Sequence, residues 1–439
     1  MPPRLLPTNT PADLVPVEGS LALAPGSRLE GKRVAMLSLS PYPADPRPRR
    51  AAEALLREGV HVDFICINND NSPKRERLNR LNILRLPIEH RRGGKVAYAC
   101  EYSSFILATA SILAFRSLKR RYDLVYVHNM PDILVLSSLL PKILGAKVIL
   151  DQHDPMPELM TTIFGLPRRS FAVRVIERLE KWSLARANLV ITVNVACKRI
   201  FGNRSCRPEK IGVVMNAPDE KIFGPQPKRP KLREAPTRPF VIMYHGSIVE
   251  RNGLDLAIEA LALVKQSIPC TELRIYGRRT SFLDKVMEQV RSKNLADCVT
   301  YRGPKSLEQL IPEIDECDVG IIPNQHSEFA EINTPTRIFE YLALGKPVIA
   351  PRATGITDYF DAGSLVFFEL GSPVDLARQI EYVFSHPVEA FEIVTRGQEV
   401  YKEHCWQTER GRLVDYVCAL LGGAGEPILR LDPQRNDAH

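Results

Sequence analysis

The sequence predicts an α/β protein with two Rossmann-like domains, each a doubly wound parallel sheet, that face a central cleft. Its 439 residues exceed what one ordinary hydrophobic core needs. Short apolar and β-branched runs alternate with amphipathic helical patterns along most of the chain, as in βαβ units. A stretch rich in proline and charge, 224–239, separates two such series.

The first series contains apolar runs with little polar alternation, which predicts strands covered on both faces. These strands are Arg33–Leu39, His61–Ile67, Asn82–Leu86, Asp123–His128, Lys147–Asp151, Asn188–Val193 and Lys210–Met215. Helical patterns separate most of them, including Arg49–Glu58, Pro131–Leu144 and Phe171–Leu184. The second series predicts strands at Phe240–His245, Glu272–Tyr276, Cys298–Tyr301, Val319–Ile322, Pro347–Ala350 and Leu365–Phe368, and a last helix at Thr408–Leu421.

These patterns divide the chain into six parts. We expect a disordered lead over 1–30, an N-terminal domain over 31–223, the linker 224–239, a C-terminal domain over 240–405, a helix over 406–424 that packs back on the N-terminal domain, and a tail over 425–439. The lead has no long apolar run, so it does not predict a signal peptide.

Composition narrows the function classes. A net charge of +8 suits an anionic partner, but no zinc finger, RNP or helix-turn-helix pattern supports nucleic-acid binding. Nine scattered cysteines without a Cys-x-x-Cys pair indicate free thiols and a cytoplasmic location. No Gly-x-Gly-x-x-Gly follows the first strand, which disfavours a dinucleotide cofactor. No Asp-x-Asp pair is present, so we expect neither a cofactor nor a required metal.

The longest uncharged apolar stretch, Tyr102–Phe115, is shorter than the roughly 20 residues that span a bilayer. Basic residues flank it on both sides, namely His90, Arg91, Arg92, Lys95, Arg116, Lys119, Arg120 and Arg121. Such a helix either lies on an anionic membrane surface or packs inside an α/β domain with solvated ends.

The stretch 333–350 predicts a helix with a marked start and end. Thr334 is a suitable N-cap, Pro335 a suitable first helical residue and Gly345 a suitable stop. Ile338 and Phe339 begin its apolar side.

The polar side of this helix holds Thr336, Arg337 and Glu340. Free N–H groups at a helix start bind anions such as a diphosphate, and a carboxylate accepts hydrogen bonds from a diol such as ribose. The alternative is an amphipathic helix whose polar side faces solvent.

A second segment, Tyr244–Asp255, joins a strand to a helix through Gly246 and Ser247. A glycine turn between a strand and a helix allows the backbone to approach a phosphate, and Arg251 is the nearby cation. Arg278 and Arg279 follow the next strand and either support Arg251 or lie in a solvated turn.

Polar residues also follow strands of the first series, where ligands of parallel sheets bind. His153 and Asp154 end one strand, and Glu158 is either a ligand contact or a helix cap. Val127–Asp132, with His128 and Asn129, ends another. Arg47 and Arg49 follow the first strand and either meet a phosphorylated acceptor or form a solvated cluster.

The segment Phe339–Ala350, Phe-Glu-Tyr-Leu-Ala-Leu-Gly-Lys-Pro-Val-Ile-Ala, resembles the donor-binding signature of retaining group 1 (family 4) glycosyltransferases, which have the GT-B fold. The resemblance covers Gly31 to about Leu421 and is strongest in the C-terminal half. It implies that Glu340 binds the nucleotide ribose. It also implies a donor site formed by Gly246, Ser247, Arg251, Arg279, Glu331, Thr334, Pro335, Thr336 and Arg337.

The same resemblance assigns the N-terminal half to the acceptor. His153, in a loop similar to the family's Asp-x-His-Asp-x-x-Pro-Glu, is expected to hydrogen-bond the donor sugar or phosphate. Arg47, His128 and Asp154 are the candidate acceptor contacts. Asn216 is similar to the family's Asn-x-x-Asp at the domain junction, which suggests a mainly structural role.

Three positions depart from the family pattern. Ser247 and Asn252 stand where relatives carry an arginine and a lysine, and Ile332 stands where many carry a glutamate facing the sugar. Glu331 or Glu328 can substitute for that glutamate, or backbone N–H groups can hold the sugar.

The resemblance implies transfer of a hexose-type sugar, with retention, from a nucleotide-diphosphate sugar to a glycan or lipid-linked acceptor in cell-surface polysaccharide synthesis. The alternatives are a nucleotide-sugar epimerase on the same fold and a non-catalytic nucleotide-sugar-binding protein. An epimerase needs acid and base groups around the sugar, and no such pair is evident.

Overall fold

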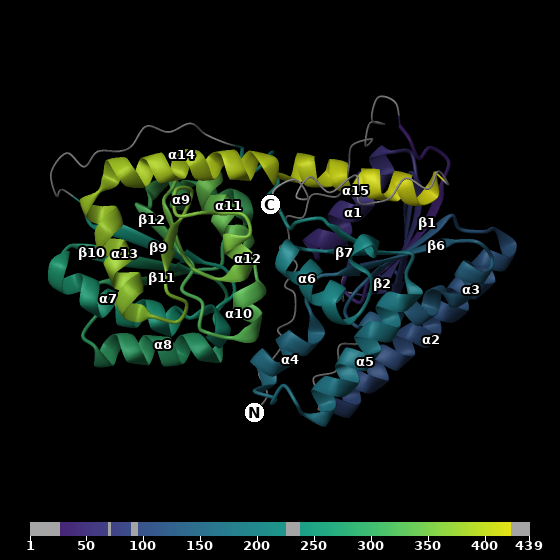
Figure 1. Ribbon diagram of the computed structural model, residues 1–439, viewed down its shortest axis with the longest axis horizontal. Helices are drawn as coiled ribbons and strands as arrows, with labels where there is room; N and C mark the ends of the chain where they lie inside the picture. Colours follow the sequence, from purple (N-terminus) through teal and green to yellow (C-terminus); the bar gives the residue numbers. More distant parts are fainter. Residues whose placement is uncertain (1–26, 69–71, 89–94, 225–237, 423–439) are drawn as a thin grey trace. The chain divides into compact units, whose positions relative to one another are not determined.

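The structure, a computed structural model, describes residues 27–68, 72–88, 95–224 and 238–422 (Figure 1). Most of the predicted lead, linker and tail lies outside the described residues, as do His90, Arg91 and Arg92. The chain forms two compact units. The first contains Met1–Met215 and Arg410–His439, and the second contains Asn216–Glu409.

The first unit is built on an eight-stranded sheet with the order β3-β4-β2-β1-β5-β6-β7-β8. The strands are β1 Arg33–Leu37, β2 His61–Ile67, β3 Arg75–Leu78, β4 Leu81–Leu86, β5 Leu124–His128, β6 Lys147–Gln152, β7 Leu189–Thr192 and β8 Ile211–Val213. All pairs are parallel except β3 with β4. Because the strands are parallel, their carboxyl ends share one edge of the sheet.

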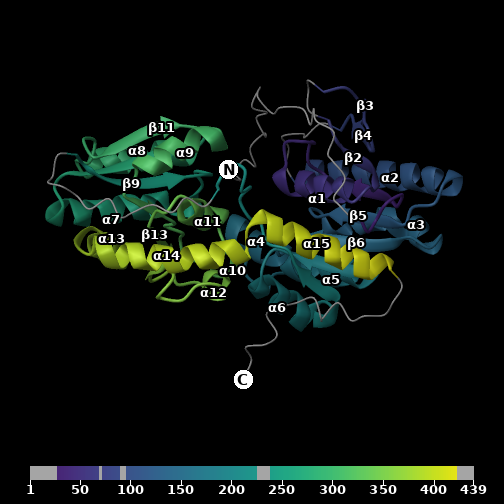
Figure 2. The ribbon, with the colours of Figure 1, turned by 90° about the horizontal axis from the view of Figure 1, so that it is seen from above.

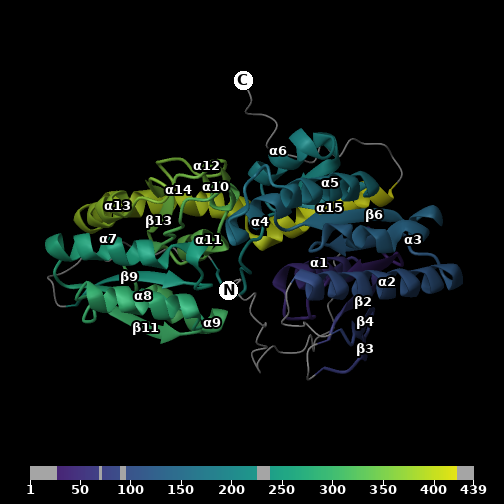
Figure 3. The same ribbon diagram turned by 90° about the horizontal axis from the view of Figure 1, so that it is seen from below.

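Helices cover both faces of this sheet (Figures 1 and 3). The helical elements are α1 Pro46–Arg57, α2 Lys95–Lys119, η1 Asp132–Ser138, α3 Leu139–Ile143, α4 Met156–Phe164, α5 Phe171–Arg186, α6 Val195–Arg204, η2 Pro208–Lys210 and α15 Trp406–Leu421. Helices α1 and α15 lie on one side of the sheet, and α2, α3 and α5 lie on the other. Tyr416 of α15 packs against Gly212 of β8, where a Cβ atom would lie 2.8 Å from its ring.

Two elements of the first unit differ from the sequence prediction. Strand β3 was not predicted, because its residues Arg-Glu-Arg-Leu form no apolar run; it pairs antiparallel to β4 as an edge strand. The predicted helix Pro131–Leu144 is a 3₁₀ segment followed by a short α-helix. No helix among the described residues is long and apolar enough to cross a bilayer.

The second unit contains a six-stranded parallel sheet with the order β11-β10-β9-β12-β13-β14. Its strands are β9 Phe240–His245, β10 Thr271–Tyr276, β11 Val299–Gly303, β12 Val319–Ile321, β13 Val348–Pro351 and β14 Val366–Phe368. Its helices are η3 Glu250–Asn252, α7 Leu254–Ser267, α8 Ser281–Ser292, α9 Leu307–Glu316, α10 Glu328–Ile332, α11 Thr336–Ala343, α12 Thr354–Thr357, α13 Pro373–Ser385 and α14 Pro387–Glu403. Helices α7 and α8 lie on one side of the sheet and α9 and α11 on the other (Figures 1 and 2).

Gly253 marks a close backbone approach next to the predicted phosphate loop. It caps α7 with φ of +66°, and a Cβ atom at this position would lie 1.7 Å from the carbonyl oxygen of Pro323. Gly303 has a similar φ of +76° but nothing within 4 Å of its Cβ position.

We therefore expect Gly253→Ala to cost about 2–4 kcal/mol, because left-handed strain adds to a backbone clash. The matched variant Gly303→Ala carries only the strain and should cost about 1 kcal/mol. Thermal unfolding should show a Tm loss of about 5–15 °C for the first and about 2–4 °C for the second. Equal losses would show that the contact with Pro323 contributes nothing.

Candidate functional site

The end of β9 and the start of α11 meet in the second unit. His245 is the last residue of β9, and Arg337 Nη1 donates a hydrogen bond of 2.6 Å to its carbonyl oxygen. Gly246 follows with φ of +124°, and a Cβ atom there would lie 3.2 Å from Arg337 Cδ. The lack of a side chain at Gly246 thus allows the loop to lie against the first turn of α11.

Glu340 lies one turn further along α11 and faces His245. Its Oε2 is 3.4 Å from His245 Nε2, and both residues are buried. Burial, and then the charge of Arg337, lowers the pKa of His245 to about 3, so its ring is neutral at physiological pH. Among the described residues, His245 Nε2 has no hydrogen-bond partner. A buried carboxylate next to such a nitrogen is suited to binding a polar ligand.

The start of α11 is not capped by a side chain of the described residues. The prediction that Thr334 is the N-cap was wrong, because its Oγ1 donates to the carbonyl oxygen of Gly355 at 2.5 Å; Pro335 occupies the cap instead. Thr336 Oγ1 donates to the carbonyl oxygen of Asn216 at 3.3 Å. The first N–H groups of the helix therefore have no competing side-chain acceptor and can receive an anion.

The predicted end of this helix is confirmed. Gly345, with φ of +68°, follows the last turn, and its N–H donates to the carbonyl oxygen of Leu342 at 2.9 Å. The next N–H, of Lys346, reaches the carbonyl oxygen of Tyr341 at 3.0 Å. This pattern satisfies the last carbonyl groups, as expected for a glycine after a helix.

The candidates near the missing glutamate have different surroundings. Glu331 Oε1 accepts hydrogen bonds from the N–H and Oγ1 of Thr354, at 3.0 and 2.6 Å. This carboxylate oxygen therefore holds the start of α12. Glu328 is exposed at the start of α10, and Ile332 is buried.

The remaining donor-loop candidates, Ser247, Arg251 and Arg279, are less buried than Glu340. The carbonyl oxygen of exposed Ser247 accepts from Tyr244 Oη and from Asn252 Nδ2, both at 2.7 Å, so Asn252 braces the loop. Arg251 is partly buried in η3. The side chain of Arg279 is 75% exposed and pairs with Asp284 at 2.8 Å, so its charge is partly neutralised there.

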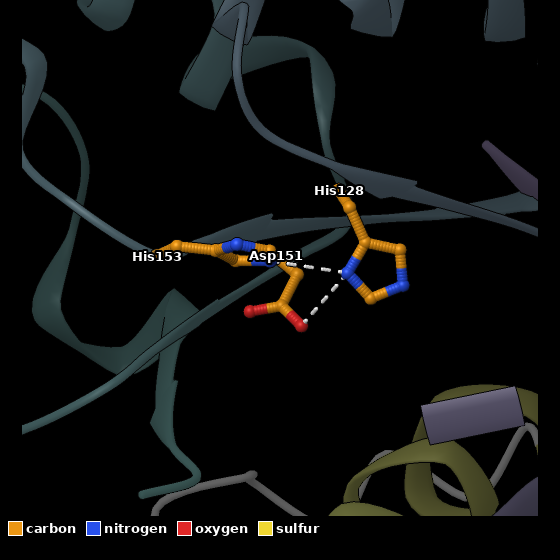
Figure 4. Close-up of side chains that lie close together, drawn as sticks. All are labelled: His128, Asp151 and His153. Carbon is orange, nitrogen blue, oxygen red and sulfur yellow. Dashed lines mark hydrogen bonds and ion pairs between the residues drawn. The ribbon is translucent and has the colours of Figure 1, made fainter. Parts of the chain in front are cut away.

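The first unit holds a second cluster at the carboxyl ends of β5 and β6 (Figure 4). His128 Nδ1 lies 3.2 Å from His153 Nε2 and 3.4 Å from Asp151 Oδ2. A carboxylate accepts and does not donate, so this contact favours a proton on His128 Nδ1. His153 Nε2 then accepts from His128, which leaves the proton of neutral His153 on Nδ1.

Asp151 is the charged centre of this cluster. Arg47 Nη2 pairs with its Oδ1 at 2.6 Å, and Tyr126 Oη donates to its Oδ2 at 3.0 Å. Burial alone would raise the pKa of Asp151, but Arg47 and the hydrogen bond from His128 hold it well below its usual range. Arg47, which the sequence predicted as an acceptor contact, thus forms an ion pair that holds the Asp151 carboxylate in place.

His153 is held in place from two sides. The backbone N–H of His153 donates to Asn129 Oδ1 at 2.8 Å. Asn129 Nδ2 donates in turn to Gln152 Oε1 and to the carbonyl oxygen of Asp154. Burial, with the charge of Arg47 next, lowers the pKa of His153 to about 3, against the opposing effect of Asp151. The ring is therefore a neutral hydrogen-bonding group and partly exposed.

Three atoms of this cluster, one each from His128, Asp151 and His153, lie within 4.8 Å of one another. Imidazole and carboxylate groups at this spacing can hold a divalent ion. As it stands, Arg47 covers Asp151 through both Nε and Nη2, and the two rings are hydrogen-bonded. The cluster is thus a hydrogen-bonded network.

Glu158, predicted as a ligand contact or a cap, lies in a buried ion network. Its Oε1 accepts from Arg168 at 2.7 Å and from Arg204 at 2.6 Å, and Arg204 also pairs with Glu180. Burial opposes its ionisation, but these arginines lower the pKa of Glu158. It is a structural residue of α4.

Sequence reasoning missed three members of these clusters. His245 immediately precedes Gly246, and its position at a strand end was a usable signal. Asp151 ends a predicted strand in the same way. Tyr126 points its hydroxyl to Asp151 from inside β5, and nothing in a buried apolar run distinguishes it.

The two units match two protein-family models. Residues 44–217 match the "Glycosyl transferase 4-like domain", and residues 239–386 match "Glycosyl transferases group 1". Together they cover well over half of the chain. The chain therefore belongs to the glycosyltransferases of the family 4 type.

Particular relatives are similar to parts of the chain. It is 29% identical over 156 residues to the amylovoran biosynthesis glycosyltransferase AmsK of Erwinia amylovora. The aligned residues cover 34% of this chain and 38% of AmsK. Sucrose-phosphate synthase from Thermosynechococcus elongatus has the same fold, with a TM-score of 0.71 and 18% identity over 90% of this chain and 100% of that one. HepE of Anabaena, in complex with UDP-glucose, has a TM-score of 0.64 and 15% identity over 88% of this chain and 99% of that one. These likenesses establish the GT-B fold.

Proposed function

We propose that this protein transfers a hexose-type sugar from a nucleotide-diphosphate sugar to a glycan or lipid-linked acceptor, with retention, in the synthesis of a cell-surface polysaccharide. The observation that carries the proposal is the group formed by Gly246, His245, Arg337 and Glu340. It places an uncapped helix start, a close backbone turn and a buried carboxylate together in one unit. These features suit the phosphates and the ribose of a nucleoside diphosphate.

In this proposal the second unit binds the donor. Glu340 accepts hydrogen bonds from the ribose hydroxyls, and the N–H groups at the start of α11 stabilise the leaving diphosphate. Arg251 supplies positive charge, and Glu331 or Glu328 contacts the sugar. A nucleotide-sugar complex of HepE, which has the same fold, supports this choice of donor class.

The first unit binds the acceptor in this proposal. His153, neutral and oriented by Asn129 and His128, donates a hydrogen bond to the sugar or phosphate. Asp154 and His128 lie on the acceptor side, and Arg47 acts through Asp151. The donor phosphate takes the proton of the acceptor hydroxyl, so no side chain is needed as the base.

A nucleotide screen tests this proposal. We expect one nucleoside diphosphate, and its sugar conjugates, to raise Tm by about 5–10 °C at a hundredfold excess over Kd, because only the folded second unit binds them. Release of nucleoside diphosphate in the presence of acceptor oligosaccharides should follow. A donor whose sugar is epimerised without release would indicate an epimerase, and binding without turnover a non-catalytic protein. The donor site is wrong if no nucleotide stabilises the protein.

A further inference from the structure

A basic cavity of about 470 Å³ lies in the first unit, at the end of the strands opposite to the end that carries His153. It is lined by Arg33, Arg75, Arg77, Arg116, Lys119 and Arg120. Arg33 is the first residue of β1, whereas His128 is the last residue of β5. Since these strands are parallel, the cavity lies at their amino ends, and the proposed acceptor site at their carboxyl ends.

The positive charge of this cavity is only partly neutralised. Glu76 pairs with buried Arg85 at 2.7 Å, and Asp63 pairs with Arg33 at 2.8 Å and lies 3.5 Å from Arg116. Among the described residues, no ion pair neutralises four other cations of the lining, which are Arg75, Arg77, Lys119 and Arg120. Such a concentration of charge favours a partner with several anionic groups.

Arg75 and Arg77 are both exposed and share one face of the β3 edge strand, since alternate residues of a strand point the same way. Arg116 and Lys119 come from the last turn of α2, with Arg120 just beyond it. Two elements distant in sequence thus bring cations to one cavity.

The outward side of α2 next to this cavity carries three exposed, large apolar side chains. Leu107, Phe115 and Leu118 are 69%, 60% and 71% exposed, and they recur at helical spacing. Lys119 Nζ lies 4.3 Å from the centre of the Phe115 ring, so the apolar and cationic groups adjoin. Helix α3, which lies beside α2 in Figure 3, ends in Ile143, which is 80% exposed.

We propose that the cavity and the outward side of α2 form a docking surface for an anionic lipid bilayer. This docking surface comprises Arg75, Arg77, Arg116, Lys119, Arg120, Leu107, Phe115 and Leu118. The cations bind lipid phosphates, while the apolar side chains enter the boundary between headgroups and acyl chains. A soluble phosphate or a nucleic acid would use the cations but leave the leucines and the phenylalanine without a role. The docking surface does not depend on the proposed reaction.

Flotation of the full-length protein with vesicles tests this assignment. We expect flotation with phosphatidylcholine vesicles that contain phosphatidylglycerol, little flotation with phosphatidylcholine alone, and release at high salt. Replacing Arg116, Lys119 and Arg120 by glutamine should weaken binding on the order of a hundredfold, since each surface cation contributes about a fivefold factor. Phe115→Ser with Leu118→Ser should also weaken binding, and its residual binding should depend on salt.

Control variants carry changes of the same kind in the second unit. Arg291→Gln with Lys293→Gln removes exposed charge, and Val374→Ser with Val388→Ser removes exposed apolar groups. Both should float as the wild type does. The proposal is overturned if anionic vesicles fail to bind the protein, if the control variants lose binding equally, or if heparin binds the docking surface and vesicles do not.

Discussion

Glu340→Gln should lower kcat/KM by about 10²–10³-fold and weaken nucleotide binding by a similar factor. The substitution keeps the size of the side chain and removes its charge. Hydrogen bonds to a charged group contribute about 1.5–3 kcal/mol each, and a ribose diol can donate two. Isothermal titration with the nucleoside diphosphate identified by the screen, followed by steady-state kinetics, would measure both effects.

The matched control for this variant is Glu288→Gln, which removes an exposed carboxylate from α8 of the same unit. It should bind and react as the wild type does. Because glutamine keeps the size and shape of the side chain, and His245 is neutral, Glu340→Gln should fold with a nearly unchanged Tm. Wild-type nucleotide affinity in Glu340→Gln would remove Glu340 from the donor site.

His153→Ala should lower kcat by about 10²–10³-fold, the loss expected when one preorganised hydrogen-bond donor is removed from a developing charge. Nucleotide binding should be largely retained, because the other proposed nucleotide contacts, Glu340 and the start of α11, lie in the second unit, which the variant leaves intact. His61→Ala, at the exposed start of β2, is the control in the same unit. A wild-type rate for His153→Ala would exclude the histidine from the reaction.

The pH dependence distinguishes this role from that of a general acid. Burial, and next Arg47, lowers the pKa of His153 to about 3, so its ring stays neutral between pH 5 and 8. The pH–rate profile should therefore contain no ionisation step of His153 between pH 5 and 8, and His153→Ala should keep the shape of the wild-type profile in this range. A general acid with an ordinary histidine pKa, near 6.5, would produce such a step.

The same shift has a consequence for stability. The folded pKa values of His153 and His245, both about 3, lie below the unfolded value near 6.5. Below pH 6.5 the unfolded chain therefore binds protons that the folded chain does not, and the free energy of unfolding falls as the pH drops toward 3. Replacing both histidines should flatten this dependence in denaturant titrations.

Much of the strand architecture was readable from the sequence. Runs such as Phe240–His245 and His61–Ile67 match the strands residue for residue, because a sheet buried on both faces requires continuous apolar residues. Strand β3 could not be read in this way. It is held by pairing with β4 at the edge of the sheet and not by a buried face, so its charged residues carry no periodic signal.

The candidate site was only partly readable. Glu340 and Gly246 belong to local patterns, so their positions could be predicted. Arg47 and Asp151, 104 positions apart, meet only because β1 and β6 place their carboxyl ends on one edge of the same sheet. No local pattern records that contact.

In the helix that begins at Thr336, some features follow from the local sequence and others from the tertiary structure. Its apolar side, its end at Gly345 and the position of Glu340 follow from residues that interact within a few positions, and the sequence by itself determined them. The roles of Thr334, bound to Gly355, and of Arg337, bound to His245, were decided by the tertiary structure. A hydrogen-bonding side chain takes the partner that folding brings near, and that partner can lie far away in the sequence.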